Sequence, residues 1–168
     1  MKTLLLALLV TISYSQELKW TKHDILNLSQ SQKEILDISY LTGSLKGYGL
    51  ELAAIALVEN SLKMKDYNVN HICGPHQVNA RIANVSCKLL EDNPYLSSKL
   101  ALDNLLYWEY RTIYNRKTNT KIHIKRSKKR MLQMYNDGYM DTKFGKETHL
   151  KKLYQAMSLL KTYYFKED

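Results

Sequence analysis

The chain has 168 residues, of which 45% are hydrophobic and 24% are charged. This length suits one domain with a buried core, and the composition excludes an intrinsically disordered chain. Six glycines and two prolines argue against a turn-rich β architecture, and the net charge of +9 favours an anionic polymer as partner. We therefore expect a single, monomeric, all-α domain.

The N-terminal segment, residues 1–15, has the pattern of a secretory signal peptide. Lys2 precedes an apolar run at 4–12, and Ser13 and Ser15 supply small residues at the positions that a signal peptidase reads. Cleavage after Ser15 would leave residues 16–168 as the mature domain. A run of nine residues is too short to span a bilayer, which needs roughly 20. A buried N-terminal helix and an uncleaved anchor are the two alternatives.

Export has consequences for location and partners. The signal predicts secretion across the inner membrane into the periplasm, with no membrane span after cleavage. It also argues against nucleic acid, which is otherwise the usual partner of such a basic protein. Peptidoglycan, which carries free carboxylates, is the anionic polymer that fits this location.

Helical patterns follow one another along the mature chain. Thr21-Lys22-His23-Asp24 resembles a capping box that opens a helix reaching about residue 41, and residues 43–49 read as a loop. Residues 50–58 are almost all apolar, which predicts a central buried helix that ends at Glu59. Apolar spacing predicts further helices over residues 75–90, 94–114, 121–135 and 146–164.

Glu59 is the candidate catalytic residue. Its carboxyl follows an apolar helix, and burial disfavours the charged form of a carboxyl. A carboxyl that keeps its proton near neutral pH can act as the general acid in glycosidic cleavage. From this feature alone, a solvated glutamate at a helix end is the better interpretation of Glu59 than a catalytic acid.

Three motifs in order change that balance. Glu59-Asn60-Ser61 is followed by Gly74-Pro75-His76-Gln77-Val78, with 18 residues from Glu59 to Gln77, and later by Tyr135-Asn136-Asp137-Gly138. A weaker match spans residues 104–110. Together they resemble the catalytic domain of the soluble lytic transglycosylases, in the lysozyme-like superfamily. Pro75-His76, Asn60 and Asp137 depart from the family's usual residues, and its last tyrosine has no clean match after residue 148.

The resemblance implies a lysozyme-like fold, with helices around a glycan-binding cleft, and a mechanism with one essential carboxyl. Glu59 would protonate the oxygen that joins N-acetylmuramic acid to N-acetylglucosamine. It would then take the C6 hydroxyl proton as a 1,6-anhydro ring closes. A hydrolytic muramidase on the same fold and a non-catalytic wall-binding protein remain alternatives. Asp66 and Asp92 are available as second carboxylates, but nothing marks either one.

Position in the motifs also implies a substrate-binding set: Gly74, His76, Gln77, Tyr135 and Asn136. Gln77 would hydrogen-bond sugar groups, and the Tyr135-Asn136 pair would line the cleft near the acid. Plain structural roles compete with each assignment. For His76 we favour a place in the cleft wall over a second acid–base function.

The two cysteines permit one disulfide in an exported chain, between Cys73 and Cys87; two reduced thiols are the alternative. Their spacing is a weak metal signal, and we expect neither a metal site nor a cofactor. The basic run at 121–130 fits a solvated helix face, or attraction to an anionic wall or outer-membrane surface.

Overall fold

A computed structural model of the chain describes residues 18–64, 71–115, 118–137 and 143–166. The signal peptide expected at residues 1–15 lies outside this part. The described elements are α1 (Lys22–Leu26), α2 (Gln30–Ser44), α3 (Gly49–Asn60), β1 (Ile72–Cys73), β2 (Val78–Asn79), α4 (Cys87–Asp92), α5 (Pro94–Tyr107), β3 (Tyr110–Asn115), β4 (Thr120–Lys125), α6 (Lys128–Asp137) and α7 (Lys143–Tyr163).

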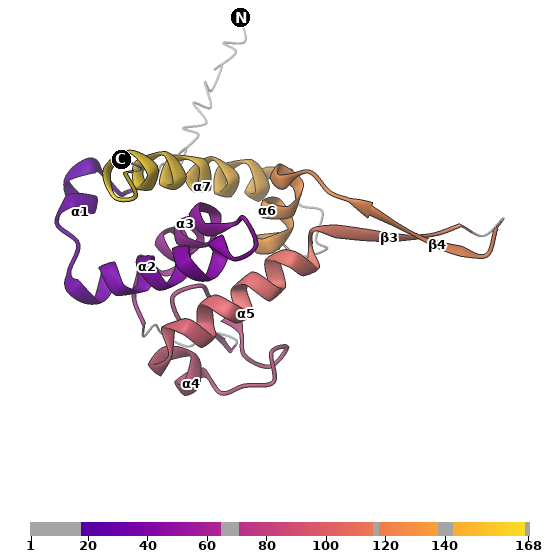
Figure 1. The fold of residues 1–168 in the computed structure, drawn as a ribbon, viewed down its shortest axis with the longest axis horizontal. Helices are drawn as coiled ribbons and strands as arrows, with labels where there is room; N and C mark the ends of the chain where they lie inside the picture. Colours follow the sequence, from indigo (N-terminus) through magenta and orange to yellow (C-terminus); the bar gives the residue numbers. More distant parts are fainter. Residues whose placement is uncertain (1–17, 65–70, 116–117, 138–142, 167–168) are drawn as a thin grey trace, which may run out of the picture.

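Helix α3 is the centre of the molecule, as the apolar run at 50–58 predicted. It contacts α2, α5 and α7, and every residue from Glu51 to Leu57 is buried. Figure 1 shows α7 running along one side of α3, with α2 and α5 on the other side. Apolar side chains all around a helix require such neighbours on several faces. The packing of α3 in the core therefore fixes the position of the backbone at Glu59, in its last turn.

The N-terminal region forms two helices where one was expected. Thr21 caps α1 through the predicted capping box with Asp24. A second capping box, between Ser29 and Gln32, starts α2 after a break at Asn27. The helical periodicity continues across the break because Ile25 and Ile35 both face the core. Periodicity alone therefore did not separate the two helices.

The expectation of an all-α domain is wrong, because the described part contains two antiparallel hairpins. β1 pairs with β2, and β3 pairs with β4 from Tyr110 opposite Lys125 to Asn115 opposite Thr120. The helix expected over 94–114 ends at Tyr107, before β3, and the helix expected over 121–135 begins at Lys128, after β4. Residues 120–125 alternate in polarity, and residues 110–114 are rich in aromatic and β-branched types, both typical of strands.

The helix expected over residues 75–90 is also wrong. The backbone takes positive φ at Gln77 (51°) and Asn84 (54°), a conformation that breaks an α-helix. Helix α4 begins at Cys87, after Ser86 accepts a hydrogen bond from the Leu89 amide. The segment between β1 and α4 is thus a compact set of turns that packs beside α5 (Figure 1).

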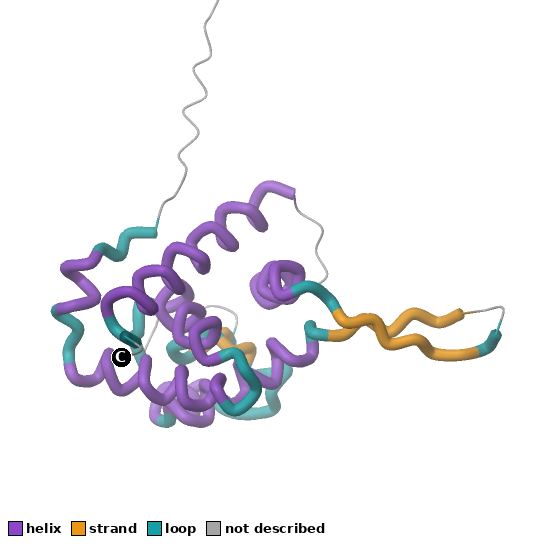
Figure 2. Tube along the Cα trace, turned by 45° about the horizontal axis from the view of Figure 1, so that its top comes forward, coloured by secondary structure: helices purple, strands orange, loops and turns teal. Residues whose placement is uncertain are grey.

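The β3–β4 hairpin projects from the helical body as a long arm (Figures 1 and 2). Its base is held by Arg126, which donates to the carbonyl oxygens of Trp108 and Tyr110 at 2.9 Å each. Lys125 forms an ion pair with Glu109 at 2.8 Å. In the described ranges, none of the helices is both long enough and apolar enough to cross a membrane.

Candidate functional site

Glu59 lies in the last turn of α3, where the sequence placed it. The side chain is 16% exposed and its Oε1 atom is shielded from solvent. The helix ends immediately afterwards, with Ser61 and Leu62 both at positive φ. This abrupt end fixes the direction of the chain after the carboxyl. A carboxyl this deep needs polar neighbours, because an isolated buried charge is strongly disfavoured.

The first such neighbour is His149, which was not among the predicted site residues. Its Nε2 atom lies 3.3 Å from Oε1 of Glu59, and its side chain is 14% exposed. His149 belongs to α7, which contacts α3 along its length. The strength of the pair depends on protonation of the imidazole. An imidazole and a carboxyl therefore face each other in a poorly solvated place.

The second neighbour is Tyr135, from α6. Burial, and then the negative charge of Glu59, raise the pKa of Tyr135 well above its ordinary value, so the hydroxyl stays protonated. That hydroxyl donates to the carbonyl oxygen of His76 at 3.1 Å. Tyr135 was expected near the acid, and it lies close enough for the charge of Glu59 to act on its hydroxyl. The hydroxyl is directed at the backbone of the 74–77 turn.

His76 lies in the interior, so it has no surface from which to contact a polymer in this structure. Its side chain is 0% exposed, with Nε2 3.0 Å from the Ser39 hydroxyl and Nδ1 3.2 Å from the Ser97 hydroxyl. The Ser39 hydroxyl donates to the Ile35 carbonyl, so it accepts from Nε2–H. Burial lowers the pKa of His76 to about 3, which keeps the imidazole neutral.

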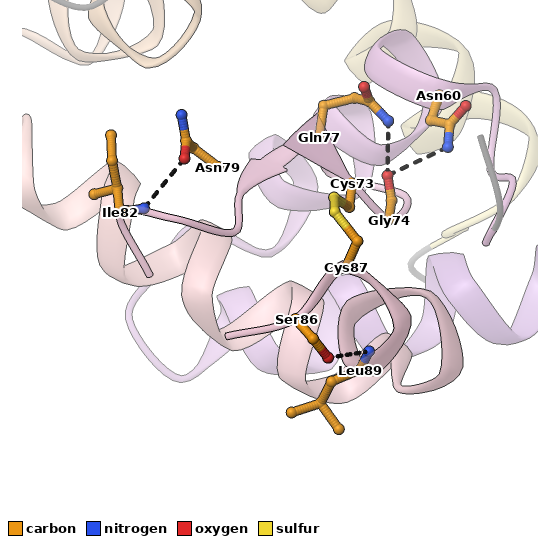
Figure 3. Close-up of a disulfide and its surroundings, with 9 residues drawn as sticks. All are labelled: Asn60, Cys73, Gly74, Gln77, Asn79, Ile82, Ser86, Cys87 and Leu89. Carbon is orange, nitrogen blue, oxygen red and sulfur yellow. Dashed lines mark hydrogen bonds between the residues drawn. A yellow bond between two sulfur atoms is a disulfide. The ribbon is translucent and has the colours of Figure 1, made fainter. Parts of the chain in front are cut away.

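The turn around Gly74 supports the end of α3. The Gly74 carbonyl accepts from Asn60 Nδ2 at 3.2 Å, and from the backbone N and side-chain Nε2 of Gln77 at 3.1 and 3.0 Å. Figure 3 shows Asn60 and Gln77 converging on this oxygen. A Cβ on Gly74 would lie 2.9 Å from Ser97 Oγ, and φ is +74°. Glycine is therefore required here.

The expected Cys73–Cys87 disulfide is present, with the two Cα atoms 5.4 Å apart (Figure 3). Cys73 ends β1 and Cys87 begins α4. The bond joins the turn that contains Gly74 and Gln77 to the helix beneath it. The segment beside Glu59 is thus restrained by a covalent bond as well as by the Gly74 hydrogen bonds.

A cavity of about 440 Å³ opens beside this end of α3. Its lining includes Val58 and Ser61, which flank Glu59 in the sequence, and Lys152, one helical turn after His149. Trp20 forms another wall. Glu59 itself is not among the residues that line this cavity. An indole ring and a lysine in its walls are suited to a polar ligand that also offers apolar faces, such as a sugar.

Two other candidates have side chains outside the described part: Asn136, which lies in α6, and Asp66. Asp92 is exposed at the end of α4. Glu51, another carboxylate on α3, is buried and forms an ion pair with Lys128 of α6 at 2.6 Å. Among the described residues, no group of three or more His, Cys, Asp and Glu could hold a metal ion.

His149 and Asn60 were not predicted as site residues, for different reasons. His149 directly follows the Glu147-Thr148 pair, after which the family has a tyrosine. A single histidine on a polar helix belongs to no recognisable motif. Asn60 was noted as a departure from the family motif. Its side chain donates to the carbonyls of Lys63 and Gly74, so it stabilises the turn after α3.

Comparison with known proteins returns no match: no family model, no curated protein and no solved structure is similar to the chain. The expected lysozyme-like fold is therefore corrected, because the structure mixes seven described helices with two β-hairpins and no solved structure matches it. What can be inferred about function rests on the residues around Glu59.

Proposed function

We propose that the chain cleaves the glycan strands of peptidoglycan, with Glu59 as the catalytic acid and base. One observation supports this most: the Glu59 carboxyl is shielded at the end of the buried helix α3 and has His149 and Tyr135 beside it. Ionisable groups clustered in a poorly solvated place are typical of active sites, because burial and neighbouring charges tune their proton affinity.

The proposed step breaks one bond and forms another without consuming water. Glu59 gives its proton to the bridging oxygen as the bond from C1 of N-acetylmuramic acid breaks, and the muramyl N-acetyl group stabilises the cationic sugar. The C6 hydroxyl then attacks C1 and returns its proton to Glu59, which closes the 1,6-anhydro ring. Substrate-assisted cleavage of this kind needs no second carboxylate.

The surroundings of Glu59 support individual parts of this scheme. The cavity lined by Val58 and Ser61 offers room for a sugar at the end of α3 that carries Glu59, with Trp20 available for stacking on its apolar face. The hydrogen bonds of Gln77 and Tyr135 hold the 74–77 turn rigid near the carboxyl. A rigid support keeps a catalytic group in its productive geometry. The substrate itself is inferred from the resemblance to lytic transglycosylases.

The test is digestion of purified sacculi by Glu59→Gln, with mass spectrometry of the released ends. General acid–base catalysis contributes about 10²–10⁴-fold, so turnover should fall by at least that factor while the fold is retained. Glu34→Gln, an exposed change of the same kind on α2, is the matched control and should keep full activity. Near wild-type digestion by Glu59→Gln would reject the assignment.

The products distinguish the alternatives. Muropeptides lighter by one water than hydrolysis products indicate the anhydro ring, whereas reducing ends indicate a hydrolytic muramidase. A protein that binds sacculi and releases nothing would be a wall-binding protein.

His149→Gln adds a second readout of the proposed site. An imidazolium beside a carboxylate favours its ionised form, so removal of His149 should extend activity to higher pH without abolishing it. A pH profile identical to that of wild type would separate His149 from the chemistry.

A further inference from the structure

The net positive charge of the chain is concentrated in one segment. Residues 110–136 contain nine of the 25 Lys and Arg residues and none of the 16 Asp and Glu residues. The rest of the chain is therefore balanced, with sixteen of each sign. In the described part this segment comprises β3, β4 and nearly all of α6, so seven of these basic residues belong to the projecting arm and its base (Figures 1 and 2).

Part of this charge has a partner inside the protein. Lys125 pairs with Glu109, and Lys128 with Glu51. Lys121 and Arg130 are exposed, and the described part of the chain offers neither of them an ion pair. The local excess therefore faces solvent, where it can attract an anionic surface.

The arm also has an apolar side. Successive side chains of a strand point to opposite faces, so Lys121, His123 and Lys125 lie on one face of β4 and Ile122 and Ile124 on the other. The isoleucines are 45% and 47% exposed. Two half-exposed isoleucines side by side on a projecting hairpin are costly in water and favourable at an apolar boundary.

From this combination we propose that the β3–β4 arm docks the protein on a bilayer that carries anionic lipid headgroups. Ile122 and Ile124 enter the boundary between headgroups and acyl chains, while Lys121 reaches around the two-stranded ribbon to the phosphates. Arg130, at the base of the arm, adds a further contact with the anionic surface. A polyanion such as the cell wall would use the charges but leave the isoleucines in water, so the bilayer fits the arm better.

The experiment is co-sedimentation with vesicles of phosphatidylglycerol and phosphatidylcholine, or of phosphatidylcholine alone, at several salt concentrations. Every variant is prepared with the same N-terminus, established by intact mass. We expect binding to the anionic vesicles that weakens with salt, and much weaker binding to the neutral ones. Equal binding to both would overturn the proposal.

Two pairs of variants locate the contact. Lys121→Gln with Arg130→Gln should weaken binding about 25-fold, since each basic residue near an anionic bilayer contributes about fivefold. Lys46→Gln with Lys88→Gln removes the same charge from exposed positions elsewhere and should weaken it by less than about twofold. Equal effects of the two pairs would show that net charge, not the arm, drives binding.

The apolar contribution is tested separately. Ile122→Ser with Ile124→Ser should weaken binding about tenfold, because each substitution removes apolar surface that the isoleucine would bury in the bilayer. Ile82→Ser is the control, because Ile82 is 85% exposed and lies far from the arm in sequence. Vesicle binding unchanged by the arm pair would reject the bilayer. If the charge variants then lost binding to sacculi, the partner would be the wall polymer.

Glu59→Gln should bind vesicles like wild type, so failure of the proposed chemistry and failure of the arm proposal are distinguishable.

Discussion

The buried His76 should make the stability of this protein depend on pH between about 7.5 and 5. Burial lowers its pKa from an ordinary 6.5 to about 3 in the folded state. Between these values the unfolded chain takes up a proton at His76 that the folded chain does not. The stabilisation is thus complete above about pH 6.5 and is lost as the pH falls toward 3.

The magnitude follows from the distance below 6.5. Each pH unit in this range changes the free energy of unfolding by about 1.4 kcal/mol for one such group, so about 2 kcal/mol should be lost at pH 5. His76 is fully buried, so screening by solvent does not reduce this figure. Protonation would also place a second N–H against the Ser97 hydroxyl, which now lies 3.2 Å from Nδ1.

The assay is urea unfolding of wild type and His76→Gln at both pH values. The variant should be less stable at pH 7.5, because it loses hydrogen bonds to Ser39 and Ser97, but its loss between the two pH values should be about 2 kcal/mol smaller. His23→Gln, at an exposed histidine, should retain the wild-type pH dependence. An equal pH dependence in wild type and His76→Gln would refute the reasoning.

The disulfide, the Tyr135 and Gln77 side chains, and the N-terminus give three further predictions. Breaking the Cys73–Cys87 bond, which closes a loop of about 15 residues, should lower the free energy of unfolding by about 3 kcal/mol in the loop-entropy model; two thiols alkylated without reductant in exported protein would contradict the bond. Tyr135→Phe should lose about 1 kcal/mol with its hydrogen bond to His76, and both it and Gln77→Ala should lose turnover on sacculi; a melting transition lost before turnover would make that residue structural. N-terminal sequencing of exported protein should begin at Gln16, and a mature cytosolic protein that retains Met1 would contradict export.

Some features of the fold could be predicted from local sequence because they depend on local physics. The apolar run at 50–58 can be satisfied only by burial on all sides, so a central helix was predicted and α3 is that helix. The Thr21 capping box is complete within four residues and was predicted for the same reason. The placement of Glu59 at the end of α3 followed directly from the length of the apolar run.

Other features were missed because tertiary contacts decided them. The helix expected over residues 75–90 gave way to turns in which the Gly74 carbonyl gathers donors from Asn60 and Gln77. The spacing of apolar residues does not indicate a hydrogen bond between α3 and a turn 14 residues later. The segments at 110–114 and 120–125 have residue patterns typical of strands, but only their pairing with each other, which is not visible in either segment alone, makes them a hairpin.

The candidate site divides in the same way. From the sequence came Glu59 and the proximity of Tyr135 to it. The structure added His149, 3.3 Å from the carboxyl, and moved His76 from the expected cleft wall into the core. Residues 59 and 149 meet because the long helix α7 packs along α3, and that packing depends on the apolar faces of both helices together. A sequence determines which residues must be buried, but only the packed fold determines which polar groups are buried together.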